Sequence, residues 1–251
     1  MTAPETLDGW FAFHDLRRLD RPAWNDLSQP DRHKAVSEAA GLLASFEEVD
    51  DAPEGHSVTY AVLGHKADVL VIHLRPDLHQ LHELDRAFDN TSLASHTIRT
   101  FSYVSVVEVS RHGAPEGTSE NIEESPYIQA RLRPEIPAYS RYVCFYPMSK
   151  KRQGLDNWYS LSNSERGDLM RVHGRTGRRY AGKVGQIVTG STGLDDWEWG
   201  VTLFADDPLQ FKKLVYEMRF DEVTARYGEF GPFYVGERLV PADLGRYLDA
   251  G

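Results

Sequence analysis

Residues 142–148 read Tyr142-Val143-Cys144-Phe145-Tyr146-Pro147-Met148, a run of aromatic and aliphatic residues that is typical of a β-strand. Further along, Ser162-Asn163-Ser164-Glu165 has the form of a capping box and predicts a helix towards Arg178. Asp207-Pro208 supplies a cap and a first-turn proline for a second helix. Further strands are predicted at 184–189, 199–204 and 233–239. The order in this half is strand-helix-strand-strand-helix-strand.

The same order of elements occurs earlier in the chain. A strand is predicted at 9–16, a helix at 31–46, strands at 57–63 and 67–74, a helix from Pro76-Asp77 to Phe88, and a strand at 101–109. Gly64-His65-Lys66 joins the two middle strands as a tight turn. This order is the ferredoxin-like pattern. We therefore predict an α+β fold in which two ferredoxin-like βαββαβ units form a dimeric α+β barrel.

A segment rich in Gly, Pro, Ser and Glu separates the two series. It is longer than an ordinary connection in a compact domain, which favours a functional segment. We predict an N-terminal ferredoxin-like half at 1–110, a connecting loop or flap at 111–139, and a C-terminal ferredoxin-like half at 140–251. The two halves share the pattern of elements without clear residue identity.

Composition and charge exclude some classes of protein. The chain has 251 residues and a formal net charge of −10, with 28 Lys and Arg against 38 Asp and Glu, which argues against general nucleic-acid binding. No run approaches the roughly 18–20 apolar residues that span a bilayer, and the N-terminus has no export-signal pattern. We expect a cytoplasmic protein that does not insert into membranes.

Cys144 is the only cysteine, so no intrachain disulfide can form, and a reducing compartment is indicated. A single thiol is also a candidate nucleophile. Because Cys144 lies within a strand-like run, a packed and inert thiol is the preferred interpretation.

The helix of the C-terminal half contains a candidate metal ligand, His173. Neutral imidazole is a common iron ligand, and an axial histidine is a standard way to hold haem. Gly174 and Gly177 each cost about 1 kcal/mol in a helix relative to alanine, which suggests a packing or ligand reason such as the approach of a flat macrocycle. A lone helical histidine is nevertheless more often a surface or hydrogen-bonded core residue, and Arg175, Arg178 and Arg179 are also typical of a solvated helix face.

A second candidate metal site is the pair His79 and His82, which are spaced i, i+3. The pair could share a metal ion, but no third ligand is evident. A surface pair is therefore favoured.

Blocks of sequence along nearly the whole chain resemble one known family. They are Glu5-Thr6-Leu7-Asp8-Gly9-Trp10, Gly64-His65-Lys66-Ala67-Asp68, Tyr103-Val104-Ser105-Val106-Val107-Glu108, Tyr146-Pro147-Met148-Ser149-Lys150-Lys151, Asp156-Asn157-Trp158-Tyr159, Tyr180-Ala181-Gly182-Lys183-Val184, Thr189-Gly190-Ser191, Trp199-Gly200-Val201-Thr202-Leu203-Phe204 and Glu217-Met218-Arg219-Phe220-Asp221-Glu222. In these blocks the sequence resembles the coproheme decarboxylases, the hydrogen-peroxide-dependent haem synthases of the chlorite-dismutase-like superfamily, in the type found in Gram-positive bacteria such as bacilli.

The resemblance implies an activity and an assembly. The substrate would be iron coproporphyrin III (coproheme), which also serves as the redox centre. Hydrogen peroxide would drive oxidative decarboxylation of two of its four propionates to vinyl groups, leaving haem b. The porphyrin would bind in the C-terminal half of each subunit of a homopentamer. No nicotinamide or flavin is implied. Whether a ferrochelatase delivers the substrate by transient contact is left open by the sequence.

The resemblance also assigns roles at the iron. His173 matches the proximal iron ligand, and Tyr146 matches the tyrosine that becomes a radical and takes a hydrogen from the propionate carbon. A phenol starts protonated near pH 7 and can lose an electron and a proton together, which suits this role. Gln186 matches the distal residue, whose amide can hydrogen-bond the incoming peroxide without supplying a charge.

Other matched residues would contact the porphyrin. Lys150, Arg131 and Arg219 match residues that hold propionates, a role for which ammonium and guanidinium groups are suited. Met148 matches a residue that lines the reactive edge of the ring, and Thr224 keeps a hydroxyl where relatives often have serine.

Local alternatives to these assignments remain. Arg133 competes with Arg131, and Lys151 competes with Lys150, although it would point to the opposite strand face. Trp158 and Trp199 fit either the pocket lining or core packing.

Other functions are open on the same residues. A chlorite dismutase or peroxidase would use haem b permanently, but resembling chlorite-degrading enzymes have a distal arginine where this chain has Gln186. A haem-binding or haem-transfer protein would bind porphyrin without consuming peroxide, and a barrel that binds no porphyrin is a further alternative.

Overall fold

The computed structural model describes residue 3 and residues 5–110, 125–137 and 140–249. By its contacts the chain divides into two compact units. Unit 1 comprises Met1–Gly9 and Ser105–Phe233, and unit 2 comprises Trp10–Val104 and Tyr234–Gly251. The units group segments by contact, whereas the predicted halves group them by order along the chain.

Unit 2 is built on an antiparallel sheet. Its strands, in spatial order, are β11 (Tyr234–Arg238), β2 (His56–Val62), β3 (Val69–Arg75), β1 (Thr6–Leu19) and β4 (Thr97–Ser110). The order β2-β3-β1-β4 is that of a ferredoxin-like sheet. Gly64 has a φ of +102° in the turn between β2 and β3, a conformation that favours glycine, so the predicted hairpin is confirmed.

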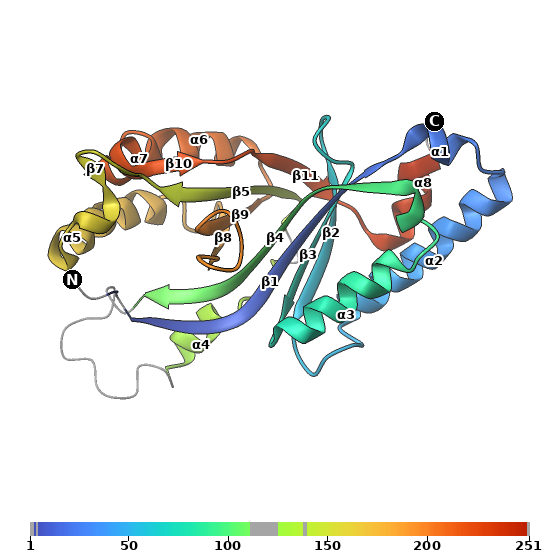
Figure 1. The fold of residues 1–251 in the computed structure, drawn as a ribbon, viewed down its shortest axis with the longest axis horizontal. Coiled ribbons are helices and arrows are strands. Elements are labelled where there is room, and N and C mark those ends of the chain that lie inside the picture. The colour runs from blue at the N-terminus through green and yellow to red at the C-terminus, as the bar shows by residue number, and fades with distance from the viewer. Residues whose placement is uncertain (1–2, 4, 111–124, 138–139, 250–251) are drawn as a thin grey trace. The chain divides into compact units, whose positions relative to one another are not determined.

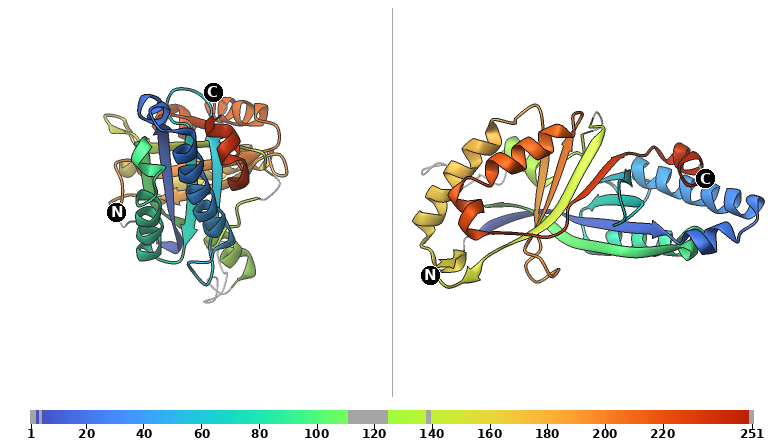
Figure 2. Two further views of the ribbon diagram at one scale, coloured as in Figure 1. Left: turned by 90° about the vertical axis from the view of Figure 1, so that its right-hand side faces the viewer. Right: turned by 90° about the horizontal axis from the view of Figure 1, so that it is seen from above.

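Two long helices cover one face of this sheet (Figures 1 and 2). They are α2 (Gln29–Glu48) and α3 (Leu78–Asp89), capped by the side chains of Ser28 and Asp77. The core between helices and sheet includes Val36, Leu43, Phe46, Leu81, Leu84 and Phe88. The shorter elements are α1 (Arg21–Asn25), η1 (Ala94–His96), η5 (Pro241–Asp243) and α8 (Leu244–Asp249).

The strands of unit 1 are also antiparallel. In spatial order its strands are β10 (Gly228–Phe230), β5 (Tyr142–Lys150), β9 (Trp199–Ala205), β8 (Gly185–Gly190) and the end of β4. The helices α5 (Asn163–Arg178), α6 (Leu209–Met218) and α7 (Glu222–Tyr227) pack together beside these strands (Figure 1). The remaining elements are α4 (Pro126–Leu132), β6 (Arg152–Gln153), β7 (Asp156–Asn157) and η4 (Trp158–Ser160).

The predicted α+β class with ferredoxin-like βαββαβ order is confirmed. The capping box at Ser162 and Glu165 is present, with the Ser162 side chain accepting from the Glu165 N–H and the Glu165 carboxylate accepting in return. Each unit also contains a strand from the other half of the chain, because β4 pairs with β8 and β11 pairs with β2. In the expected α+β barrel, strands from one half of the chain pair with strands from the other half in this way.

Two details differ from the sequence-based expectation. Order along the chain assigns the closing strand 233–239 to the C-terminal half, but β11 belongs to unit 2 because it pairs with β2. The composition of 111–139 predicts a loop, but the segment contains α4, which begins with Pro126 and packs Leu132 against Leu7 and Val109. The rest of the predicted flap, 111–124 and 138–139, lies outside the described residues.

No helix in the described part of the chain combines the length and the apolar character needed to cross a membrane.

Candidate functional site

Strand register gathers several predicted residues on one face of the sheet in unit 1. Tyr146, Met148 and Lys150 alternate along β5 and therefore share a face. Trp199 is the β9 partner of Met148 and lies on the same face. Lys150 is buried at this face, whereas Lys151 follows the end of the strand. The register therefore supports Lys150 over Lys151.

Gln186 lies on the same face as Tyr146. It pairs with Leu203, which in turn pairs with Cys144, two residues before Tyr146 on β5. The Gln186 side chain is exposed, and Cys144 is buried, as its strand-like surroundings predicted. The sheet thus brings the predicted distal amide and the predicted radical tyrosine to one side.

Tyr146 is buried among aromatic rings. Its ring stacks on Phe233 with the centroids 4.4 Å apart, and the ring of Phe230 lies 5.8 Å away. Burial raises the pKa of the Tyr146 phenol well above its usual value, and the Arg219 guanidinium opposes this rise. The phenol therefore stays protonated at neutral pH, as a donor of a hydrogen atom must.

Lys150 is a buried cation at the end of β5. Its ammonium lies 4.9 Å from the centroid of the Trp158 ring. Burial lowers the pKa of Lys150 to about 8, and the carboxylates of Asp221 and Glu198 limit the fall. The ammonium form still dominates at pH 7, so the side chain can hold an anion or release a proton near neutral pH.

His173 on α5 forms a hydrogen bond with a buried carboxylate. Nδ1 of His173 lies 2.9 Å from Oδ2 of Asp221. A carboxylate that accepts from Nδ1–H fixes that tautomer and leaves Nε2 with a lone pair for a metal ion. The side chain of His173 is 26% exposed, so the ring is supported but still accessible.

Asp221 is the residue on which the site converges, and sequence reasoning gave it no role. Its Oδ1 accepts from the N–H of Thr224 at 2.9 Å, which caps α7, while its charge also acts on Lys150. The pattern of an aspartate three residues before a threonine at a helix start could have indicated the cap. The contact with His173, 48 residues away, had no signal in the sequence.

Arg219 and Thr224 lie beside this cluster. Arg219 follows α6, and its guanidinium carbon lies 3.8 Å from the centroid of the Phe230 ring. Because Phe230 also contacts Tyr146, the exposed Arg219 is within electrostatic reach of the phenol. Thr224 is buried in α7.

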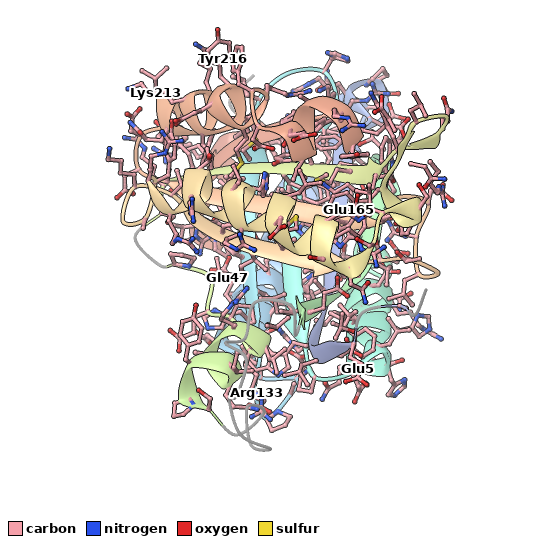
Figure 3. The ribbon with its side chains drawn as sticks, turned by 90° about the vertical axis from the view of Figure 1, so that its left-hand side faces the viewer. Glu5, Glu47, Arg133, Glu165, Lys213 and Tyr216 are labelled. Carbon is pink, nitrogen blue, oxygen red and sulfur yellow. The ribbon has the colours of Figure 1, made fainter. Side chains whose placement is uncertain are left out.

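The predicted anion contact Arg131 lies on α4. The guanidinium carbon of Arg131 lies 5.9 Å from the centroid of the Tyr127 ring, and both Arg131 and Arg133 are exposed. Figure 3 shows Arg133 near α4, while Lys213 and Tyr216 lie on α6 at the opposite edge of the view. Within the described residues, no contact joins Arg131 to Tyr146, and the choice between the two arginines stays a prediction.

Trp199 has a partner that sequence reasoning missed. Its Nε1–H donates to Oε1 of Glu108 on β4 at 3.2 Å. Burial raises the pKa of the Glu108 carboxyl above its usual value, although the bond from Trp199 opposes the rise. A Cβ at Gly190 would lie 2.5 Å from the Glu108 carboxyl group, so this glycine makes room for the pair. The contact holds the indole beside Met148.

The two glycines of α5 that follow His173 have different surroundings. A Cβ at Gly177 would lie 3.2 Å from Cε of Met218, so packing against α6 explains this glycine. A Cβ at Gly174 would meet only a guanidinium nitrogen of Arg178, at 3.7 Å. Packing within the protein therefore does not explain Gly174, and the interpretation that a flat ligand approaches beside His173 still applies to this glycine.

The other candidate metal site gains no support. His79 and His82 are both exposed on α3. Within the described ranges, no group of three or more His, Cys, Asp and Glu residues could hold a metal ion.

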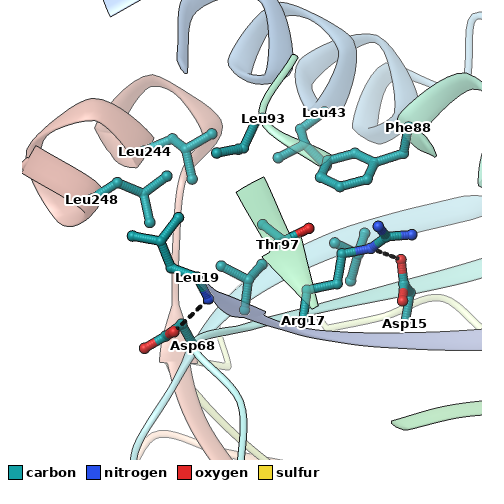
Figure 4. A pocket seen from close by; sticks show the side chains of 12 residues that line it. Asp15, Arg17, Leu19, Leu43, Asp68, Phe88, Leu93, Thr97, Leu244 and Leu248 are labelled. Atoms are coloured by element: carbon teal, nitrogen blue, oxygen red, sulfur yellow. Dashed lines mark hydrogen bonds and ion pairs between the residues drawn. The ribbon is translucent and has the colours of Figure 1, made fainter. Parts of the chain in front are cut away.

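A small apolar cavity lies in unit 2, and none of the predicted site residues lines it (Figure 4). Leu43, Phe88, Leu93 and Leu244 form part of its wall. The ion pair between Arg17 Nε and Asp15, at 2.6 Å, lies at its edge. It is a packing gap between α2, α3 and α8 rather than a place for a porphyrin.

Comparison with known proteins identifies the family. The chlorite dismutase family profile matches residues 32–239. A haem-binding protein from Thermus thermophilus is 48% identical, covers 99% of this chain and 100% of its own, and has a TM-score of 0.90. A variant chlorite dismutase from Candidatus Nitrospira defluvii is 20% identical over 95% of this chain and 94% of its own, with a TM-score of 0.76. A chlorite dismutase from the same organism in complex with imidazole has the same identity and coverage and a TM-score of 0.74.

The fold, together with His173 bonded to the buried carboxylate of Asp221, is that of an α+β protein of the chlorite-dismutase-like type. The chain belongs to the chlorite dismutase family.

Proposed function

We propose that this chain is an oxidoreductase that converts iron coproporphyrin III to haem b with hydrogen peroxide. The observation that carries the proposal is the convergence of His173, Lys150 and Thr224 on Asp221, with Tyr146 on the same strand face as Lys150. A histidine that could serve as an axial ligand, a protonated phenol and a buried ammonium thus lie in one region. The haem-binding character of the 48% identical Thermus protein also supports a porphyrin ligand.

The residues present fit an iron porphyrin. Nε2 of His173 would hold the iron, because Asp221 takes the other ring nitrogen. Lys150 and Arg219 would bind propionates, with Arg131 as a further contact. Met148 and Thr224 would line the ring and its edge. The iron, when bound, would supply the redox chemistry that reduces hydrogen peroxide.

Each propionate step balances as follows. The propionate loses one hydrogen from its β carbon and releases carbon dioxide, which leaves a vinyl group. The substrate loses two electrons, and peroxide takes them up with two protons and becomes two water molecules, so one proton is consumed overall. Tyr146 would pass an electron and its phenol proton towards the oxidant and then take the hydrogen from the propionate carbon. Gln186 would hydrogen-bond the peroxide without adding charge.

We extend the proposal to the setting of the enzyme. A homopentamer in the cytoplasm, with transient contact to a ferrochelatase as the source of substrate, would suit a reaction on an iron porphyrin. Sedimentation analysis of the purified protein tests the pentamer directly.

One experiment tests the proposed reaction. The purified protein is titrated with iron coproporphyrin III, peroxide is added in small steps, and the porphyrin is followed by chromatography and mass spectrometry. Two successive losses of carbon dioxide are expected. An unchanged or merely bleached macrocycle would contradict the proposal.

The Tyr146→Phe variant is the matched control for the radical step. It keeps the ring that stacks on Phe233 but lacks the phenol hydrogen. It is expected to bind coproheme as tightly as the wild type and to stall before the first loss of carbon dioxide. Normal turnover by this variant would remove Tyr146 from the mechanism.

A second candidate function is that of a haem enzyme or haem-binding protein that keeps its porphyrin unchanged. Membership of the chlorite dismutase family favours it. Chlorite turnover with release of oxygen, or tight binding of haem b without consumption of peroxide, would be its signature. The uncharged Gln186 is the residue that argues for decarboxylation instead.

A further inference from the structure

Arg166 on α5 is a buried cation with few partners. The residue is only 8% exposed. Its Nη2 donates to the side-chain oxygen of Asn163, but its Nε has no hydrogen-bond partner among the described residues. No Asp or Glu in the described part of the chain forms an ion pair with it. Glu165, the acidic residue of the same turn, has its carboxylate bound to Ser162.

This position is unfavourable for a cation. A buried charge without a counter-ion is destabilising, because it has lost water and gained little in return. Arg166 is also the fourth residue of α5, so it lies within the positive first turn of the helix dipole. Both effects would be relieved by an anion bound at this point.

Arg166 shares a helix face with His173. The two residues are seven positions apart, which is two turns, or about 10 Å along the axis at 1.5 Å per residue. Leu169 lies between them and packs against the cluster of Trp158, Val223 and Tyr227, and the Lys150 ammonium lies 4.9 Å from the centroid of the Trp158 ring. The guanidinium is also close enough to Tyr159 to act on its phenol electrostatically. Arg166 therefore belongs to the same neighbourhood as Lys150.

We propose that Arg166 is a binding residue for one carboxylate of an anionic porphyrin. This inference rests on the proposed function. The substrate proposed above has four propionates, and the resemblance supplies three cations for them, Arg131, Lys150 and Arg219. Arg166 would be the fourth. A guanidinium with an unused Nε–H can bind a carboxylate through two parallel hydrogen bonds.

If Arg166 binds a carboxylate, the substitution Arg166→Met should raise the stability of the ligand-free protein and lower its affinity for the porphyrin. Arg166→Met removes an unpaired buried charge and keeps an unbranched chain, so the ligand-free protein should resist urea better than the wild type. The same variant should bind metal-free coproporphyrin III about 10- to 100-fold more weakly, since it lacks a charge-assisted contact. The metal-free ring is used so that the His173–iron bond does not contribute. A purely structural role for Arg166 would instead make the variant less stable.

Two further variants are the controls. Arg175→Met makes the same change at an exposed position of α5 and should leave stability and binding nearly unchanged. Arg166→Lys keeps the charge without the two-pronged group and should bind with intermediate affinity. It also allows the binding test if Arg166→Met fails to fold.

The outcomes separate this inference from the proposed function. Arg166→Met and Arg166→Lys with wild-type affinity would overturn the role of Arg166 and leave the proposed function standing. Lower stability of folded Arg166→Met in the ligand-free state would also overturn it. If the wild type bound neither coproporphyrin III nor its iron complex, both the role of Arg166 and the proposed function would be overturned.

Discussion

The carboxylate of Asp221 meets two demands with its two oxygens. One oxygen caps α7 at Thr224 and the other accepts from His173. Because the side chain is buried, both bonds form where water does not compete, and the same charge limits the fall of the Lys150 pKa. One acidic residue thus links a helix start to the proposed axial ligand, His173, and to a buried cation, Lys150.

Asp221→Asn tests this link. The amide oxygen can still cap α7 at Thr224, but the amide NH2 would then face Nδ1 of His173 and favour the tautomer with the proton on Nε2. We expect the axial bond to iron to weaken, with about a 10- to 100-fold loss of coproheme affinity.

Absorption and electron paramagnetic resonance spectra of the coproheme complex report the axial ligand directly. Thermal unfolding of the ligand-free variant is the control and should change little, because the cap is kept. An unchanged axial signature would show that Asp221 does not set the His173 tautomer.

Helix α5 combines features that serve stability with features that oppose it. Its capping box at Ser162 and Glu165 stabilises the start of the helix. Its inner face carries Arg166 and His173, while the glycines at 174 and 177 weaken the helix interior by about 1 kcal/mol each relative to alanine. The helix is therefore less stable than the same helix with alanine at these two positions. Such a loss of stability is a common cost of function, which is consistent with the proposed binding site.

Gly174→Ala and Gly177→Ala form a matched pair for this helix. Gly174→Ala adds a methyl group in ordinary van der Waals contact with Arg178, at 3.7 Å, and should raise the free energy of unfolding by about 0.5–1 kcal/mol. Gly177→Ala should gain less, because the new Cβ lies 3.2 Å from Met218 and the methionine must move. Urea unfolding of the two variants without ligand measures the difference.

Porphyrin binding by the same pair tests the reason for Gly174. If a flat macrocycle lies beside this residue, Gly174→Ala should weaken coproheme binding while Gly177→Ala should not. Equal affinities of both variants and the wild type would leave Gly174 without a ligand role.

Unit 2 carries buried charges and histidines but none of the predicted catalytic residues. His14 and His73 lie on opposite faces of its sheet, since His73 pairs with Phe13, the neighbour of His14. His73 is held between aromatic rings and forms a 2.8 Å hydrogen bond with Ser57. Burial lowers the pKa of each histidine from 6.5 to about 3.

These histidines predict how stability depends on pH. Above a pH of about 6.5 neither the folded nor the unfolded chain protonates them, so their full contribution is present. As the pH falls from 6.5 towards 3, the unfolded chain takes up protons that the folded chain refuses, and the free energy of unfolding falls. The slope is about 1.4 kcal/mol per pH unit for each histidine.

Urea unfolding at a series of pH values between about 7.5 and about 4.5 measures this slope, with His14→Gln and His73→Gln compared at the same temperature and salt. On unfolding at acidic pH, each variant should take up about one proton fewer than the wild type. If the free energy of unfolding of both variants had the same slope against pH as that of the wild type, the histidines would be charged in the folded protein or other groups would set the slope.

Much of the fold follows from local patterns along the chain. Strand alternation, the capping box at Ser162 and the Gly64 turn depend on neighbours within a few residues, so they predicted elements that the structure confirms. Alternation along β5 also puts Tyr146 and Lys150 on one face from the sequence alone. The connecting loop or flap at 111–139 stays a prediction. The helix α4 within it was not predicted, because a composition rich in Gly and Pro does not reveal the packing of Leu132.

The chain by itself determined the α+β order of elements and, through family resemblance, the candidates His173 and Tyr146. Only the tertiary structure brought Asp221 to His173, Glu108 to Trp199, and the strand β11 to β2. These contacts join residues 48 and 91 positions apart or segments from different halves. Local propensity does not encode them, because they form only when helices and strands pack and exclude water around charges that need partners.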